Sequence, residues 1–172
     1  MPPRVVLVGL PGTGKSTVGA ELARRLEVAF ADSDELIAQQ TGRSVGEIFS
    51  SQGEPAFRQL EADVIAEALG GFDGVLALGG GAVATESVRQ DLVGSGVLVV
   101  RLSAGQDELL SRLAGNRSRP LLAGNAAARL AELAEAREPL YREVASLTVP
   151  TGGRSPAEVA AVLHEQLIGQ PS

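Results

Sequence analysis

The sequence predicts an α/β fold in which helices cover both faces of a parallel sheet. Short apolar runs alternate along the chain with segments of helical periodicity, which is the pattern of repeated strand–helix–strand units. Three of the apolar runs end in loops rich in glycine or aspartate, and ligands bind at these strand ends in open sheets. The 172 residues, 44% of them hydrophobic, are expected to form a single domain, 1–172, with its own core.

The expected strands are short and rich in valine, leucine and alanine, which is typical of strands buried on both faces. They cover residues 4–8, 28–31, 74–78 and 97–102, and a short fifth strand could follow at 147–149. The apolar spacing predicts helices at 16–26, 34–40, 44–69, 106–113, 132–137 and 156–167. A break is expected near 53–55, where Gly53 and Pro55 interrupt the helical pattern.

The first strand leads directly into residues 9–16, an octet that fits the phosphate-binding P-loop pattern G-x-x-x-x-G-K-[ST] at every fixed position. Backbone N–H groups of such a loop, together with the N-terminus of the following helix, bind polyphosphate. Lys15 is the only lysine among 15 basic residues, and a compact ammonium fits between phosphates better than a guanidinium does. The predicted nucleotide triphosphate site consists of Gly12, Thr13, Gly14, Lys15, Ser16 and Thr17.

Two aspartates follow the second strand, and we expect them to have different roles, on the interpretation that they point to opposite sides if the chain stays extended. Asp32, through a water molecule, and Ser16 are predicted to hold Mg²⁺, since the third strand supplies no acid before its glycines. Asp34 would then face the acceptor and take the proton from its hydroxyl. The alternative is that Asp32 or Ser33 merely caps the next helix.

Arg58 and Glu61 lie three residues apart, on one face of a predicted helix. The spacing alone favours a surface ion pair, and the alternative is an arginine that binds a substrate carboxylate and is oriented by Glu61. The triplet 79–81 follows the third strand, and three glycines indicate close approach of the backbone to a ligand, with a sharp loop as the alternative. The glycine-bounded stretch 115–125 carries Arg117 and Arg119, and we expect it to close over the phosphates as a lid.

Composition and charge argue against several other classes of function. The net charge of −6 disfavours nucleic acid as the main partner, and no apolar run approaches the roughly 18 residues of a membrane span. The chain leaves no room for a signal peptide before the first strand, and the absence of cysteine fits a reducing compartment, so a cytoplasmic protein is expected. A switch GTPase would need an Asn-Lys-x-Asp motif, but the sole lysine lies in the P-loop.

Six motifs occur in the order and spacing of the shikimate kinases, and the resemblance extends to about Leu167. They are residues 9–17, 32–34, 57–61, 79–81, 119–122 and 137–141. The resemblance implies a three-layer α/β/α kinase fold, similar to nucleoside monophosphate kinases, with a five-stranded parallel sheet, a helical substrate-binding region at about 32–62 and a mobile lid at about 115–125. It also implies a monomer that uses ATP and Mg²⁺ to phosphorylate the 3-hydroxyl of shikimate, on the route to chorismate and the aromatic amino acids.

The same resemblance implies roles for individual residues. The catalytic groups would be Asp34 as the base, Lys15, and Arg119 in the lid. The carboxylate and ring of shikimate would be held by Arg58, Arg137, Gly79, Gly80 and Gly81, with Glu61 orienting Arg58 and Phe49 and Phe57 forming the walls. Residues resembling those that enclose adenine are Arg112, Arg154 and Pro156, whereas Tyr141 is interpreted as a packing residue.

The chain departs from the family pattern immediately before the glycine triplet. Members of the family often carry a serine or threonine there, able to hold a magnesium-bound water, whereas this chain has Ala77 and Leu78. Altered affinity for the metal is therefore expected. Another small-metabolite kinase, such as a gluconate kinase, is the main alternative function, and it should lack the clamp formed by Arg58 and Arg137.

Overall fold

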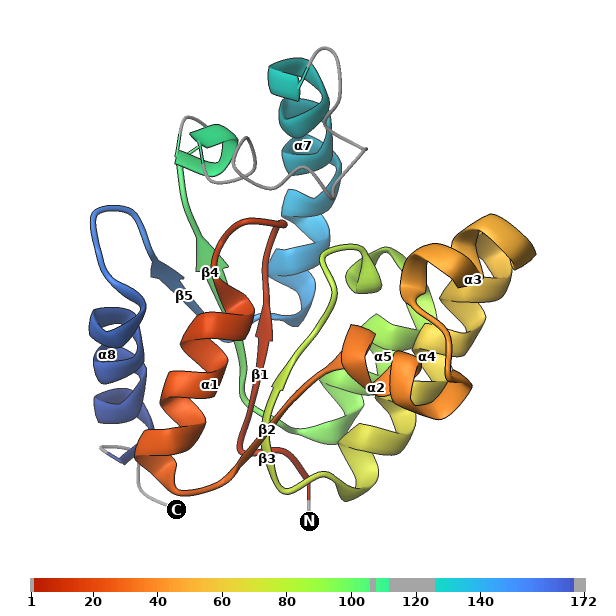
Figure 1. Cartoon of the computed structure of the whole chain (residues 1–172). Coiled ribbons are helices and arrows are strands. Elements are labelled where there is room, and N and C mark those ends of the chain that lie inside the picture. Colours follow the sequence, from red (N-terminus) through yellow and green to blue (C-terminus); the bar gives the residue numbers. More distant parts are fainter. Residues whose placement is uncertain (1, 106–107, 112–125, 169–172) are drawn as a thin grey trace.

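A computed structural model of the chain describes residues 2–105, 108–111 and 126–168. Five parallel strands form one sheet in the order β2-β3-β1-β4-β5, which confirms the predicted five-stranded parallel sheet (Figure 1). The strands are β1 Val5–Val8, β2 Ala29–Asp32, β3 Gly74–Ala77, β4 Val99–Ser103 and β5 Leu147–Pro150. Because β1 lies between β3 and β4, the loops that leave β1 and β3 emerge side by side at the carboxyl edge of the sheet.

Helices cover both faces of the sheet, so the three-layer α/β/α architecture is confirmed. The helical elements are α1 Lys15–Leu26, α2 Ser33–Thr41, α3 Val45–Gln52, α4 Glu54–Gly71, the 3₁₀ turn η1 Ala82–Ala84, α5 Glu86–Ser95, α7 Ala126–Val144 and α8 Pro156–Ile168. The part of the expected helix 106–113 that the structure describes, residues 108–111, is helical. The predicted lid at 115–125 lies outside the described residues.

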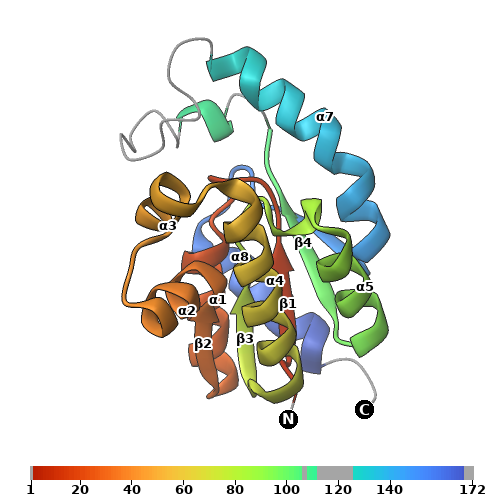
Figure 2. The ribbon, with the colours of Figure 1, turned by 90° about the vertical axis from the view of Figure 1, so that its right-hand side faces the viewer.

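Alternating side chains of β1 build the two cores. Val5 and Leu7 face α1 and α8, which pack together on one side of the sheet (Figure 1). Val6 and Val8 face the opposite side, where α4, α5 and α7 pack (Figure 2). A third, smaller cluster joins α2, α3 and α4, and it holds the predicted substrate-binding region against the edge of the sheet near β2.

Two helices differ from the sequence-based expectation. Helix α5 was not predicted, because Val88 and Leu92 are its only fully buried residues and the rest of its sequence is polar or glycine except for the exposed Val93. The predicted segment 132–137 belongs to the much longer α7, which continues through Pro139 to Val144. A proline inside a helix normally marks an end, so the sequence argued against this continuation. By contrast, the expected break near 53–55 is present at Gly53, whose φ is 86°.

Among the described residues, no helix is both long and apolar enough to cross a membrane.

Candidate active site

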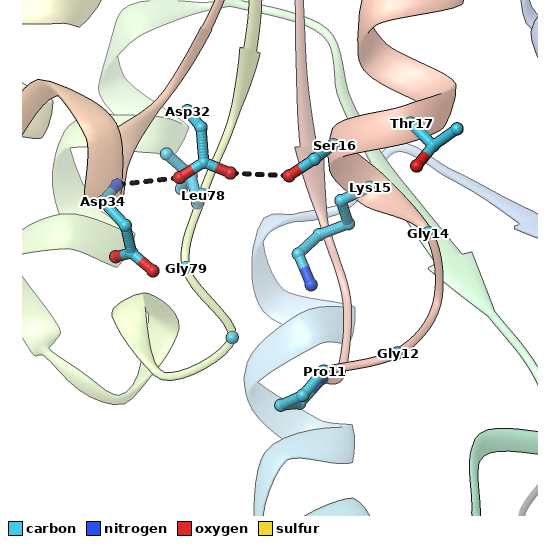
Figure 3. Close-up of a pocket in the computed structure, with 11 residues that line it drawn as sticks. Pro11, Gly12, Gly14, Lys15, Ser16, Thr17, Asp32, Asp34, Leu78 and Gly79 are labelled. Carbon is cyan, nitrogen blue, oxygen red and sulfur yellow. Dashed lines mark hydrogen bonds between the residues drawn. The ribbon is translucent and has the colours of Figure 1, made fainter. Parts of the chain in front are cut away.

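The P-loop joins β1 to α1 and surrounds the start of the helix. Gly14 caps α1 in a left-handed conformation with φ of 90°, so the first N–H groups of the helix face the loop. A Cβ atom on Gly9 would lie 2.6 Å from the carbonyl oxygen of Leu102 on the adjacent β4, so only glycine fits there. Lys15 donates from Nζ to the carbonyls of Gly9 (2.8 Å) and Leu10 (3.1 Å) and points into the pocket (Figure 3).

This pocket lies between the P-loop, the end of β2 and the end of β3. Its lining residues are Pro11, Gly12, Gly14, Lys15, Ser16, Thr17, Asp32, Asp34, Leu78, Gly79 and Gly80. The two predicted aspartates and most of the predicted nucleotide-binding loop are therefore brought to one cavity. Thr13 belongs to the loop in another way, because it is buried and its hydroxyl donates to the carbonyl of Leu10 at 2.9 Å.

Asp32 caps the next helix, as one of the sequence alternatives proposed, and it also contacts Ser16, its predicted partner in holding Mg²⁺. Its Oδ1 accepts from the backbone N–H of Asp34 at 2.8 Å and so caps α2, while its Oδ2 accepts from the Ser16 hydroxyl at 2.8 Å (Figure 3). The expectation that Asp32 and Asp34 point to opposite sides was wrong. Side chains two residues apart lie on the same side of an extended chain, and both carboxylates line the same pocket, at the point where the chain turns helical at Ser33.

The Ser16–Asp32 pair supplies the hard oxygen donors that Mg²⁺ prefers, directly beside the phosphate-binding loop. Within the described part of the chain, no three carboxylate, histidine or cysteine side chains gather as a complete metal site. This fits a Mg²⁺ ion that takes its other ligands from nucleotide phosphates and water. Leu78 follows Ala77, the register partner of Asp32, and it lines the pocket with a side chain that has no polar atom.

Each glycine of the triplet 79–81 makes room for a different neighbour. A Cβ atom on Gly79 would lie 2.8 Å from Oδ1 of Asp34, and one on Gly80 would lie 2.9 Å from the ring of Pro11. On Gly81 it would come within 2.9 Å of Cζ of Arg58. Since Cβ contacts below 3.0 Å essentially never occur, the triplet allows the backbone to pass between the predicted base, the P-loop and the predicted clamp arginine.

Arg58 and Glu61 form a partly buried pair in α4, with side chains 22% and 1% exposed, so the surface ion pair that spacing alone favoured was wrong. Nη1 of Arg58 lies 2.8 Å from Oε1 of Glu61, whose side chain is only 1% exposed. The guanidinium also stacks on Phe57 and Phe49, with Cζ at 5.2 and 5.9 Å from the two ring centroids. The aromatic rings and Glu61 therefore fix the plane of the guanidinium, and one edge of it faces Gly81.

Arg137 reaches the triplet from α7. Its Nη1 donates to the carbonyl of Gly80 at 2.8 Å, so the guanidinium groups of Arg137 and Arg58 contact neighbouring residues of one loop from two different helices. Two converging guanidinium groups are suited to a planar carboxylate. The sequence placed these two arginines 79 residues apart, and the fold brings them together.

The predicted adenine-binding residues fall only partly within the described chain. Arg154 and Pro156 line a second pocket on the other side of the P-loop, together with Thr13, Gly14, Thr17, Val18, Thr151 and Val159. Arg112, Arg117 and Arg119 lie outside the described residues. Pro11, Thr151 and Ser33 were not predicted as site residues. Thr151 is buried after β5 and could have been suspected, because it follows a strand end.

Burial raises the pKa of Glu61 above its ordinary value of 4.5, although the hydrogen bond from Arg58 opposes this shift. As the pH falls through this raised pKa, Glu61 takes up a proton and loses its hold on Arg58. We therefore expect the KM for an acceptor that carries a carboxylate to increase on the acid side at a pH above that of an ordinary glutamate. Steady-state kinetics across pH test this, and Glu61→Gln should give a high KM that lacks the acid-side increase.

The contribution of Glu61 to stability changes with pH in the opposite direction to that of an ion-paired surface carboxylate. A raised pKa in the folded state means that the contribution of Glu61 is favourable below its unfolded pKa and is lost as the pH rises through the folded pKa. Glu61→Gln should therefore be at least as stable as the parent at neutral pH. A variant that unfolds more readily and keeps the acid-side increase in KM would contradict both expectations.

Comparisons with known proteins place this site in a family. The shikimate kinase family model matches residues 11–168. The chain is 47% identical over 174 residues to the shikimate kinase of Mycobacterium tuberculosis, covering 100% of this chain and 98% of that protein. It is 51% identical over 164 residues to the shikimate kinase of Corynebacterium glutamicum, covering 94% and 95% of the two chains.

Solved structures agree with these sequence matches. A shikimate kinase from Acinetobacter baumannii in complex with shikimate has a TM-score of 0.90 and 36% identity, covering 98% of this chain and 94% of that chain. A gluconokinase from Sinorhizobium meliloti reaches a TM-score of 0.65 at 22% identity, which indicates a shared fold and nothing further. The match of the family model and the relatives over almost the whole length show that the chain belongs to the shikimate kinase family.

Proposed function

We propose that the chain transfers the γ-phosphoryl group of ATP to the 3-hydroxyl of shikimate, giving shikimate 3-phosphate and ADP on the route to chorismate and the aromatic amino acids. The observation that carries this proposal is the convergence of Arg58 and Arg137 on the glycine triplet, next to Asp34 and opposite the P-loop. An acceptor with a carboxylate at one end and a hydroxyl at the other fits this order of groups.

On the acceptor side, Arg58 and Arg137 bind the carboxylate, and the backbone of Gly79, Gly80 and Gly81 lies along the ring. Phe57 is buried and Phe49 packs against it, with ring centroids 4.7 Å apart, so the two rings form an apolar wall beside the clamp. Glu61 holds Arg58 in place from behind. Asp34 faces the reacting hydroxyl, orients it toward the phosphate and accepts its proton.

On the nucleotide side, the backbone N–H groups of the P-loop and the start of α1 bind the phosphates. Lys15 stays in contact with the γ-phosphoryl group while it is transferred. Mg²⁺, when bound with ATP, neutralises charge on the phosphate oxygens. Ser16 would bind the ion directly and Asp32 through water. Arg119 from the lid would add positive charge at the γ-phosphate, and Arg112, Arg154 and Pro156 would enclose the adenine.

The acceptor is tested by measuring ADP release with MgATP in the presence of shikimate, gluconate or a nucleoside monophosphate. Turnover that depends on shikimate and is absent with the two controls is the expected result. Turnover with gluconate, or ATP binding with no acceptor-dependent turnover, would overturn the proposal. We further propose that the chain acts as a monomer in the cytoplasm and without a nucleic acid partner, and sedimentation of the purified protein checks the first of these.

A further inference from the structure

The glycine triplet of residues 79–81 has to be held by contacts from outside, because glycine has more backbone freedom than any other residue. Among the described residues, the backbone–backbone hydrogen bonds of the triplet are two turn bonds into η1, from Ala82 N to Gly79 O and from Ala84 N to Gly81 O, each 3.1 Å long. The triplet nevertheless carries the proposed contacts to the acceptor. The side chains that hold its backbone from outside therefore decide where the acceptor is bound.

Ser33 holds the first glycine. Its hydroxyl accepts from the backbone N–H of Gly79 at 2.9 Å, and the residue is completely buried at the start of α2. Asp34 is the next residue in the chain, and its Oδ1 is the atom that leaves no room for a Cβ on Gly79. The hydrogen bond from the Gly79 N–H to Ser33 thus fixes the distance between the triplet and the proposed base.

Tyr141 holds the second glycine from the opposite side. Its hydroxyl donates to the carbonyl of Gly80 at 3.2 Å, and the residue is only 1% exposed. Its ring lies beneath Arg101, with Cζ 5.1 Å from the ring centroid, and Arg101 is itself paired with Glu138. The tyrosine is therefore fixed by the sheet and by α7, and its hydroxyl has little freedom to leave the carbonyl.

The Gly80 carbonyl also accepts from Arg137 at 2.8 Å. On acceptor binding we expect Arg137 to turn its guanidinium toward the carboxylate, which would leave the Gly80 carbonyl with one donor fewer. The Tyr141 hydroxyl remains as its partner, so the backbone stays in place without an unpaired polar group. A phenyl ring in place of Tyr141 could fill the same volume, but it has no hydroxyl to donate to the Gly80 carbonyl.

We propose that Ser33 and Tyr141 are positioning residues that hold the glycine triplet in its acceptor-binding conformation by one hydrogen bond on each side. This inference rests on the proposed function, since shikimate is the acceptor whose binding it concerns. Neither hydroxyl contacts the reacting atoms in this account. Both act through the backbone of Gly79 and Gly80, and neither Ser33 nor Tyr141 is among the residues that line the two pockets beside the P-loop.

The test measures KM for shikimate and KM for ATP separately in Tyr141→Phe and Ser33→Ala. Each variant should raise the KM for shikimate about five-fold, the factor expected for the loss of one hydrogen bond, and change the KM for ATP by less than about two-fold. Ser95→Ala is the matched control, because it removes a hydroxyl that donates to the Leu92 carbonyl at 2.8 Å in α5, away from the site. It should leave both constants unchanged.

A second measurement needs no variant. Tyr141 is the only tyrosine of the chain, which has no tryptophan, so the intrinsic fluorescence of the protein reports on this residue alone. Shikimate should change this fluorescence saturably as Arg137 leaves the shared carbonyl. Unchanged fluorescence at a shikimate concentration that saturates turnover would overturn the role of Tyr141.

The outcomes separate this inference from the proposed function. Parent protein that does not turn over shikimate would overturn both. If the parent protein is active, two results would overturn only the positioning roles. The first is an unchanged KM for shikimate in both variants, and the second is an equal rise in the KM for shikimate and the KM for ATP. A rise confined to the shikimate constant in Ser33→Ala supports the inference even if Tyr141→Phe fails to fold.

Discussion

Asp34→Asn should lower kcat for shikimate phosphorylation by about 10²- to 10⁴-fold, the range expected for the loss of a general base. The substitution keeps the size of the side chain but removes the carboxylate that would accept the proton. ATP affinity should change little, because Asp34 lies at the start of α2, on the side of the pocket away from the P-loop (Figure 3). Steady-state kinetics and calorimetric titration with MgATP measure the two effects.

Glu35→Gln is the matched control, since it neutralises the neighbouring carboxylate of the same helical turn, which is exposed and does not line the pocket. It should keep full activity. If Asp34→Asn lost ATP binding together with turnover, Asp34 would be a structural residue. If it kept near-normal turnover, another group would have to accept the proton.

Lys15→Met should lower kcat by roughly 10²- to 10³-fold, as is typical when one preorganised group that stabilises transition-state charge is removed. It should also weaken ATP binding, because the ammonium lies among the loop carbonyls at the mouth of the phosphate site. Activity and nucleotide affinity are therefore expected to fall together, in contrast to Asp34→Asn.

Lys15→Arg provides the sharper comparison, because it keeps the charge and changes only its shape. A planar guanidinium cannot occupy the narrow position of an ammonium, so this variant should remain far below the parent in kcat. Activity of Lys15→Arg near that of the parent would show that charge alone is sufficient. Unchanged turnover in Lys15→Met would contradict the assignment of the P-loop.

Much of the nucleotide side could be predicted because its chemistry is local in sequence. The P-loop needs a strand, a glycine loop and a helix start in direct succession, and residues 5–26 contain all three. The sheet could be predicted for a similar reason, since buried parallel strands are continuous apolar runs. The two contacts of Asp32 could not be predicted, because capping of α2 and contact with Ser16 use different oxygens of one carboxylate.

The acceptor side depends on contacts between distant segments, and the sequence alone said less about it. Spacing within α4 pairs Arg58 with Glu61 but does not indicate that Glu61 is buried, which changes a weak surface contact into a fixed clamp. The interpretation of Tyr141 as a packing residue was correct for its ring and incomplete for its hydroxyl. The family resemblance supplied the clamp role of Arg58 that spacing alone disfavoured.

The central claim is that phosphate is transferred to one hydroxyl of shikimate, and the structure of the product tests it most directly. Phosphorus–proton correlation NMR of the reaction mixture should show a single phosphate ester at the 3-hydroxyl, formed in equal amount to ADP. A phosphate ester at another hydroxyl would contradict the proposed position of Asp34. Inorganic phosphate in place of an ester would contradict the transfer itself.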